Sequence, residues 1–121
     1  MRRIPVFTAE TPRTTEDELY LLLREEKVEE FNARRPKNEP CDLSGLDFRG
    51  LNLRGMDLEA VDFTDSYFRQ ADLAGLNFNR VKLEGASIGG ANISGTYLPR
   101  ELSPQEIMMS VKYGTRLRYG T

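Results

Sequence analysis

Histidine and tryptophan are absent from the 121 residues of this chain, and cysteine occurs once, as Cys41. Histidine is the commonest general base in enzymes and the commonest metal ligand, so its absence argues against both kinds of site. One cysteine excludes an intrachain disulfide and, without histidine, a structural zinc site. We therefore predict no catalytic residue, no metal ligand and no cofactor, and we expect the chain not to be an enzyme.

The sequence also lacks a long apolar run and an excess of one charge. The 17 basic and 19 acidic residues give a net charge of -2, too balanced to predict binding to nucleic acid or to a membrane surface. A membrane span needs about 20 apolar residues, and the apolar stretch at residues 4–7 is also too short for a signal peptide. We expect a cytoplasmic protein of one domain, with neither nucleic acid nor a membrane among its partners.

A five-residue repeat runs without a slip over residues 41–100. The third place of each block is always Leu, Phe or Ile, the second place is mostly Asp or Asn, and the fifth place is Gly in seven blocks. The blocks are CDLSG, LDFRG, LNLRG, MDLEA, VDFTD, SYFRQ, ADLAG, LNFNR, VKLEG, ASIGG, ANISG and TYLPR.

A period of five fits neither a helix, which repeats near 3.6 residues, nor a strand, which repeats at 2.0. Apolar residues at the first and third places, separated by a polar one, indicate a short extended segment with two inward side chains. The glycine that closes most blocks can adopt the positive φ of a tight turn. Each block therefore predicts one side and one corner of a coil, and successive coils would pair in parallel about 4.8 Å apart.

These blocks resemble the repeats of the pentapeptide-repeat family, whose consensus is A(D/N)LXX. The resemblance implies an all-β solenoid, a right-handed quadrilateral β-helix with four blocks per coil, and residues 41–100 then make about three coils. Residues twenty apart would stack, so that Leu43, Phe63 and Leu83 form one inward column. The family favours alanine at the first place, whereas Leu46 and Met56 are large. We therefore expect the first coil to be wider or distorted.

Four of the middle blocks end without glycine, at Ala60, Asp65, Gln70 and Arg80. Residues with a side chain are disfavoured at positive φ, so we expect these corners to adopt turns that avoid it. A solenoid exposes an apolar face at each end and needs a cap there.

The flanking residues predict one capping helix at each end of the coils. Thr15 to Glu18 matches a capping box, and the helix that it opens is expected to end near Arg35, before Pro36. At the other end, Ser103 and Pro104 predict a helix start, and Gly114 a C-terminal cap. We divide the chain into an N-terminal tail (1–13), a helical cap with a linker (14–40), the β-helix (41–100), and a C-terminal helix with a tail (101–121).

The aspartates at the second places are candidates for paired catalytic carboxylates. The repeat itself requires Asp or Asn there to hydrogen-bond the turn backbone, so we assign them a structural role. Cys41 occupies an inward first place and has no histidine to activate its thiol, so we interpret it as a small core residue. The aspartates are Asp42, Asp47, Asp57, Asp62 and Asp72.

Two surfaces are candidates for binding. Arg49, Tyr67 and Arg69 are expected on one outer side, on adjacent coils, and Arg and Tyr are enriched where proteins bind each other. The alternative is an ordinary solvated face.

In the C-terminal helix, Ile107, Met108 and Val111 would cover the last coil, which leaves Met109 and Tyr113 as a second apolar face for a homodimer. The alternative is that Met109 packs on the tail of its own chain.

The sequence favours a non-enzymatic protein-interaction or structural module whose protein partner is unidentified. The resemblance also raises an alternative, a DNA-mimicking modulator of DNA gyrase of the quinolone-resistance type. Residues 41–100 carry eight acidic and six basic residues, whereas about 15 Å of duplex would carry about nine negative charges. The charge density therefore argues against the mimic, and an enzyme remains the least favoured class.

Overall fold

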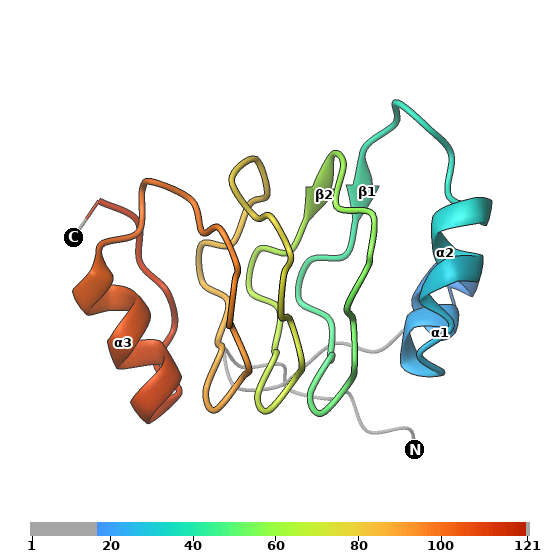
Figure 1. Cartoon of the computed structure of the whole chain (residues 1–121). Helices are drawn as coiled ribbons and strands as arrows, with labels where there is room; N and C mark the ends of the chain where they lie inside the picture. Colours follow the sequence, from blue (N-terminus) through green and yellow to red (C-terminus); the bar gives the residue numbers. More distant parts are fainter. Residues whose placement is uncertain (1–16, 121) are drawn as a thin grey trace, which may run out of the picture.

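A computed structural model describes residues 17–120 of the chain. Helices α1 and α2 lie at one end, the coils follow, and helix α3 lies at the other end (Figure 1). The predicted tail of residues 1–13 and the predicted helix start at Thr15 lie outside the described residues.

The coils are held together by parallel pairing between residues twenty apart. Strand β1 (Cys41–Asp42) pairs in parallel with strand β2 (Val61–Asp62). Isolated parallel bridges continue this register around the stack, as between Asp47 and Tyr67. The offset of twenty confirms the prediction of four blocks per coil. We name the four sides of the stack by their blocks: first (41–45, 61–65, 81–85), second (46–50, 66–70, 86–90), third (51–55, 71–75, 91–95) and fourth (56–60, 76–80, 96–100).

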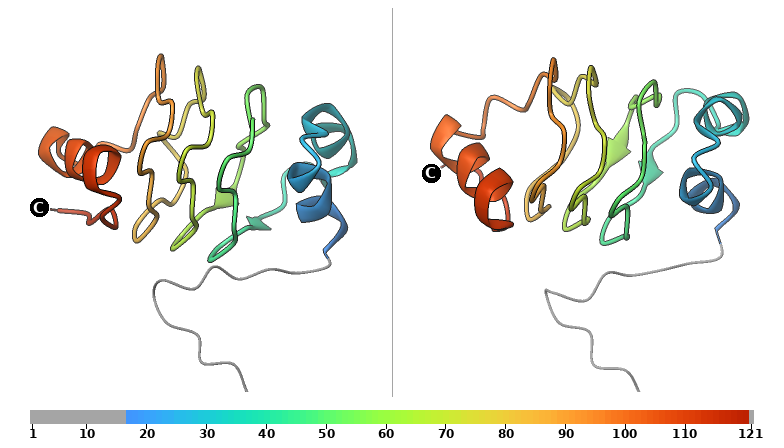
Figure 2. Two further views of the ribbon diagram at one scale, coloured as in Figure 1. Left: turned by 90° about the horizontal axis from the view of Figure 1, so that it is seen from below. Right: turned by 60° about the horizontal axis from the view of Figure 1, so that its bottom comes forward.

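The side chains at the third places fill the stack, as the repeat predicts. Phe48, Phe63 and Phe68 are buried in its centre, where the rings of Phe48 and Phe68 stack 5.2 Å apart. Leu58, Ile93 and other members at the ends of the columns are only half-buried. The parallel loops of the three coils are visible from two further directions in Figure 2.

The prediction for the corners without glycine is wrong at three of the four positions. Ala60, Asp65 and Gln70 have φ values of 56°, 61° and 59°, in the left-handed region. The ladders on both sides of a corner fix where the chain must turn, and this tertiary constraint overrides the local preference of the residue. Arg80 is not among the residues with positive φ that the structure describes.

The N-terminal segment forms two short helices where the sequence predicts one. Helix α1 (Glu18–Arg24) starts at the N-cap Asp17, whose carboxylate accepts hydrogen bonds from two backbone N–H groups, and helix α2 (Val28–Arg34) follows. The chain reverses at Glu26, which has a φ of 60°. The break lets the apolar residues of both helices reach the core, and the buried members are Tyr20, Leu22, Leu23 and Phe31.

Side chains of these helices hydrogen-bond the free edge of the first coil. The Tyr20 hydroxyl donates to the carbonyl of Asp47 at 2.9 Å, and the Asn32 amide donates to the carbonyl of Gly55 at 2.9 Å. The backbone N–H of Asp57 donates to the Asn32 side chain at 2.8 Å. Three backbone groups at this edge, which has no preceding coil to pair with, are therefore bonded by α1 and α2.

The C-terminal helix has the predicted bounds. Helix α3 (Pro104–Tyr113) starts after the N-cap Ser103 and ends at Gly114, which has a φ of 71°. The prediction that Met108 covers the last coil is wrong, because Met108 is 60% exposed. Ser110 is buried instead, and its hydroxyl accepts a hydrogen bond from the backbone N–H of Ile88 at 3.1 Å.

The chain after α3 turns back along the second side of the third coil. Arg116 pairs in antiparallel fashion with Ser87, and Leu117 is buried. The backbone of Leu117 donates to Ala86 at 2.8 Å and accepts from Gly85 at 2.7 Å. This segment therefore acts as a further strand at the edge of the last coil.

Candidate partner-binding groove

A groove of about 790 Å³ lies where the second side of the stack meets α3 and the segment after it. We call it the Arg69 groove. It is lined by all three residues of the predicted partner surface, Arg49, Tyr67 and Arg69, and also by Met109. The lining residues are Arg49, Tyr67, Arg69, Glu84, Gly85, Ser87, Glu106, Met109, Gly114, Thr115, Arg116, Leu117 and Arg118.

Arg49 is fixed by the aspartate two residues before it in the same block. Its Nε donates to Asp47 Oδ1 at 2.9 Å and its second guanidinium nitrogen donates to Asp47 Oδ2 at 3.0 Å. Burial opposes ionisation of the Asp47 carboxyl, but the hydrogen bonds from Arg49 outweigh burial and lower its pKa. Arg49 is therefore a neutralised cation at the rim of the groove.

Arg69 occupies the same place in the next coil, but its block carries Tyr67 where the block of Arg49 carries Asp47. No hydrogen bond or ion pair to the Arg69 guanidinium occurs within residues 17–120. The other arginines of the groove do have carboxylate partners: Arg49 with Asp47, Arg116 with Asp65 at 3.6 Å, and Arg118 with Glu106 at 3.1 Å.

Arg69 lies against the C-terminal end of α3. A Cβ atom on Gly114 would be 3.3 Å from the guanidinium of Arg69, and one on Gly89 would be 2.9 Å from the Cα of Gly114. Because the contact at Gly89 is with backbone, only glycine there allows the helix end to approach the coil this closely. The helix C-terminus carries a partial negative charge, which stabilises the nearby arginine.

Tyr67 supports one wall of the groove together with Arg116. The Arg116 guanidinium lies 5.0 Å from the centre of the Tyr67 ring, and it donates hydrogen bonds to the Tyr67 hydroxyl and to the carbonyl of Gly85. The sequence did not indicate that Arg116 or Arg118 would belong to this surface. Only the reversal at Gly114 brings the last residues onto the second side.

The predicted dimer surface on α3 is split between two environments. Met109 is 45% exposed and lines the groove, near Leu117 of the same chain. Tyr113 is 61% exposed and carries Lys112 over its ring, with the Lys112 Nζ 5.1 Å from the ring centre. The two residues therefore do not form one flat patch, although both are accessible.

The second-place aspartates bond the turn of their own block. The Oδ1 of Asp42, for example, accepts from the backbone N–H of Ser44 at 2.9 Å. Cys41 is half-buried and packs against the core, and burial raises the pKa of its thiol. Among residues 17–120, no group of three or more carboxylate or thiol side chains is placed to hold a metal ion, and no helix is long and apolar enough to cross a membrane.

Coils of four blocks that pair in parallel, each block with an apolar third place, define a repeat protein built from stacked coils. A comparison with family models identifies the repeats: residues 41–75 and 62–98 match the model of pentapeptide repeats, with 8 copies. This segment of the chain belongs to the pentapeptide-repeat family. No match was found among the curated proteins or among the solved structures.

Proposed function

We propose that this chain is a non-enzymatic protein-interaction module. In this proposal the coils form a right-handed quadrilateral β-helix, α1 and α2 close one end, and α3 closes the other. The stack serves as a rigid support for the Arg69 groove, to which a protein partner binds.

The observation that carries this proposal is the state of Arg69. Its guanidinium lines an open groove, offers five N–H donors and has no carboxylate partner within residues 17–120. A carboxylate from a partner would form a charge-assisted hydrogen bond there, beside the exposed apolar side chain of Met109. The groove therefore fits an acidic segment of a protein that also carries an apolar residue.

The experiment compares two arginine variants of the full chain. The partner captured by the wild-type chain is identified, and its dissociation constant is measured against wild type, Arg69→Gln and Arg100→Gln. Arg100 is the control because it is exposed and lies outside the groove. Loss of a charge-assisted hydrogen bond predicts weakening of about tenfold or more for Arg69→Gln, and no change for Arg100→Gln. Equal affinity of all three proteins would refute the groove as the partner site.

No observation in the structure favours the alternative of a DNA mimic. Four of the eight acidic residues on the coils are paired with a basic side chain, as in the pair of Arg54 with Asp72 at 2.8 Å and that of Lys37 with Asp57 at 3.2 Å. A supercoiling assay of DNA gyrase with added protein tests the alternative directly, and we expect no inhibition at micromolar concentration.

A further inference from the structure

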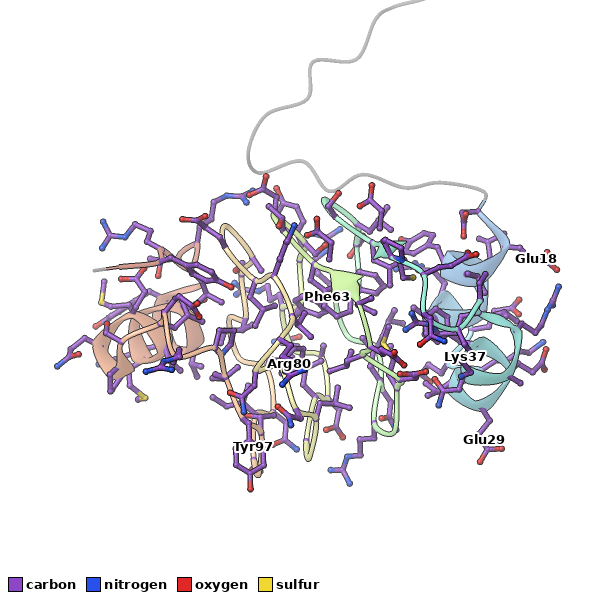
Figure 3. All side chains as sticks on the ribbon, turned by 90° about the horizontal axis from the view of Figure 1, so that it is seen from above. Glu18, Glu29, Lys37, Phe63, Arg80 and Tyr97 are labelled. Carbon is purple, nitrogen blue, oxygen red and sulfur yellow. The ribbon has the colours of Figure 1, made fainter. Side chains whose placement is uncertain are left out.

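The fourth side of the stack is open between the first and second coils. On the other three sides these coils are joined by parallel pairs, such as Asp47 with Tyr67. Asp57 and Asn77 hold the equivalent places on the fourth side, and they form no such pair in the part of the chain that the structure describes. A cavity of about 630 Å³ lies between the two blocks instead. Figure 3 labels Arg80, which lines this cavity.

The first side shows which hydrogen bonds are missing. There, the backbone N–H of Leu43 donates to the carbonyl of Asp62 at 2.9 Å, and that of Gly45 donates to the carbonyl of Thr64 at 2.8 Å. Donors at the third and fifth places of one coil thus bond acceptors at the second and fourth places of the next.

On the fourth side the same groups face the cavity unbonded. One wall presents the N–H groups of Leu58 and Ala60, and the other presents the carbonyl groups of Asn77 and Asn79. None of these four groups has a hydrogen-bond partner within residues 17–120.

The fourth side also differs from the others in the size of its first-place residues. Met56 and Leu76 are both large, both buried and twenty residues apart, so that one stacks on the other. Overfilling a core displaces the backbone, and the missing pairs lie at the side that carries these two large residues. The other sides combine a large residue with a smaller one: Leu46 with Ser66, Leu51 with Ala71, and Val61 with Cys41.

We propose that this opening binds an extended segment of a second protein, which enters as an additional parallel strand between the first and second coils. The segment would accept hydrogen bonds from Leu58 and Ala60, and it would donate hydrogen bonds to Asn77 and Asn79. Addition of a strand to unpaired edges is an established mode of peptide recognition. This site is separate from the Arg69 groove, and no residue lines both.

The walls define the chemistry of the segment. Its inward residue next to Met56 and Leu76 must be small, because that level of the core is already overfilled. Its outward residues lie between Glu59 and Arg80, one acidic and one basic side chain, so polar residues suit those positions. The hydrogen-bond donors on one wall are two residues apart, and so are the acceptors on the other wall. This spacing matches the two-residue repeat of an extended backbone, so the site fits a peptide better than other ligands.

The test uses the full-length ¹⁵N-labelled chain and a blocked heptapeptide that copies residues 70–76, QADLAGL. The peptide has alanine at the first place and can form the complete parallel ladder. In the free protein, we expect the amides of Leu58 and Ala60 to exchange faster with solvent than those of Leu43 and Gly45. Peptide binding should shift the resonances of Leu58 and Ala60 and slow their exchange by about tenfold or more.

Two controls make the result specific. A peptide with proline in place of its central leucine lacks the N–H that would reach Asn77, and it should not bind. In the variant Met56→Ala the coils can approach, so we expect Leu58 and Ala60 to be protected without peptide and peptide binding to be lost. If Met56→Ala does not fold, Leu76→Ala provides the same test.

Three outcomes would overturn the proposal. One is full protection of Leu58 and Ala60 in the free wild-type chain. Another is the absence of resonance shifts at about 5 mM peptide, which excludes even a millimolar complex. The third is a set of shifts confined to the edge of the third coil near Gly95. Arg69→Gln should leave peptide binding unchanged, so failure here is distinguishable from failure of the groove as a partner site.

Discussion

Replacement of Phe63 by alanine tests the assignment of the core. The side chain of Phe63 is 1% exposed and lies in the middle coil (Figure 3). Its ring makes edge-to-face contacts with Phe68 and Phe48, with ring centres 4.9 and 5.4 Å apart. A third ring, that of Phe78, is tilted to it at 6.4 Å. The cavity left by alanine would therefore be walled by rings that coils on both sides hold in place.

The magnitude follows from these contacts. Phenylalanine to alanine in a core costs about 3–5 kcal/mol, and the cost is greatest where the surroundings cannot collapse. Lost edge-to-face pairs add to the loss of buried area, so we expect Phe63→Ala to reduce the free energy of unfolding by about 4–5 kcal/mol. Because domains of this size have about 5–15 kcal/mol of stability, the variant should be barely folded or should lose about 15–30 °C in Tm.

Urea unfolding followed by circular dichroism measures the effect, since the chain has no tryptophan for fluorescence. Lys82→Ala is the matched control: Lys82 belongs to the same side of the neighbouring coil, but its side chain is exposed. An exposed substitution should change stability by less than about 0.5 kcal/mol. Equal losses for Phe63→Ala and Lys82→Ala would refute the inward assignment of the third place.

Four further predictions follow from the structure. Ala60→Gly removes left-handed backbone strain of about 1–2 kcal/mol, but it stabilises the unfolded chain by about 0.4–1 kcal/mol through added conformational entropy. Thermal unfolding should therefore show a small stabilisation of the variant. Clear destabilisation would contradict the positive φ at residue 60. Gly89→Ala places a methyl group 2.9 Å from the Cα of Gly114 and should cost about 1–3 kcal/mol, measured by urea unfolding; a neutral result would disprove the close approach. The lowered pKa of Asp47 contributes stability that is present above the unfolded pKa near 3.9 and is lost as pH falls through the lower folded pKa. The loss of stability below about pH 4 should therefore be smaller in Asp47→Asn than in wild type. Urea midpoints measured across this pH range test the difference. Self-association through α3 stays a prediction: sedimentation at about 100 μM should show a dimer for wild type and a monomer for Met109→Glu, and a monomeric wild type would exclude it.

The repeat predicted which side chains point inward, and the resemblance to the pentapeptide-repeat family implied the twenty-residue offset. Leu43, Phe63 and Leu83 could be assigned to one column because four blocks of five residues place residues twenty apart above one another. The start and end of α3 were predictable for a similar reason, since Ser103 and Gly114 act through local hydrogen bonds and local backbone geometry.

The errors lie where distant contacts decide the local structure. The chain breaks at Glu26 between α1 and α2 although no proline or glycine marks the place, because both helices have to bury apolar residues against the same coil. Met108 points to solvent because α3 docks through Ser110 and the close approach at Gly114, neither of which an apolar periodicity reveals.

The candidate sites were predictable only in part. Adjacency of Arg49, Tyr67 and Arg69 followed from the offset of twenty, but the second wall of their groove required the reversal after α3, which carries Arg116 onto Tyr67. The expected distortion of the first coil followed from its large first-place residues. The place of the distortion could not be predicted in the same way, because it depends on the stacking of Met56 on Leu76.

The sequence by itself determined which side chains point inward, because a strict period of five fixes them, and its resemblance to the pentapeptide-repeat family implied four blocks per coil. Only the tertiary structure decided which cation lacks a partner and which side of the stack is open. Those properties depend on how residues far apart in the chain meet: Arg69 with the end of α3, and Met56 with Leu76. A repeat specifies neighbours one coil away, whereas the ends of the chain and the fit of unequal side chains are settled by packing.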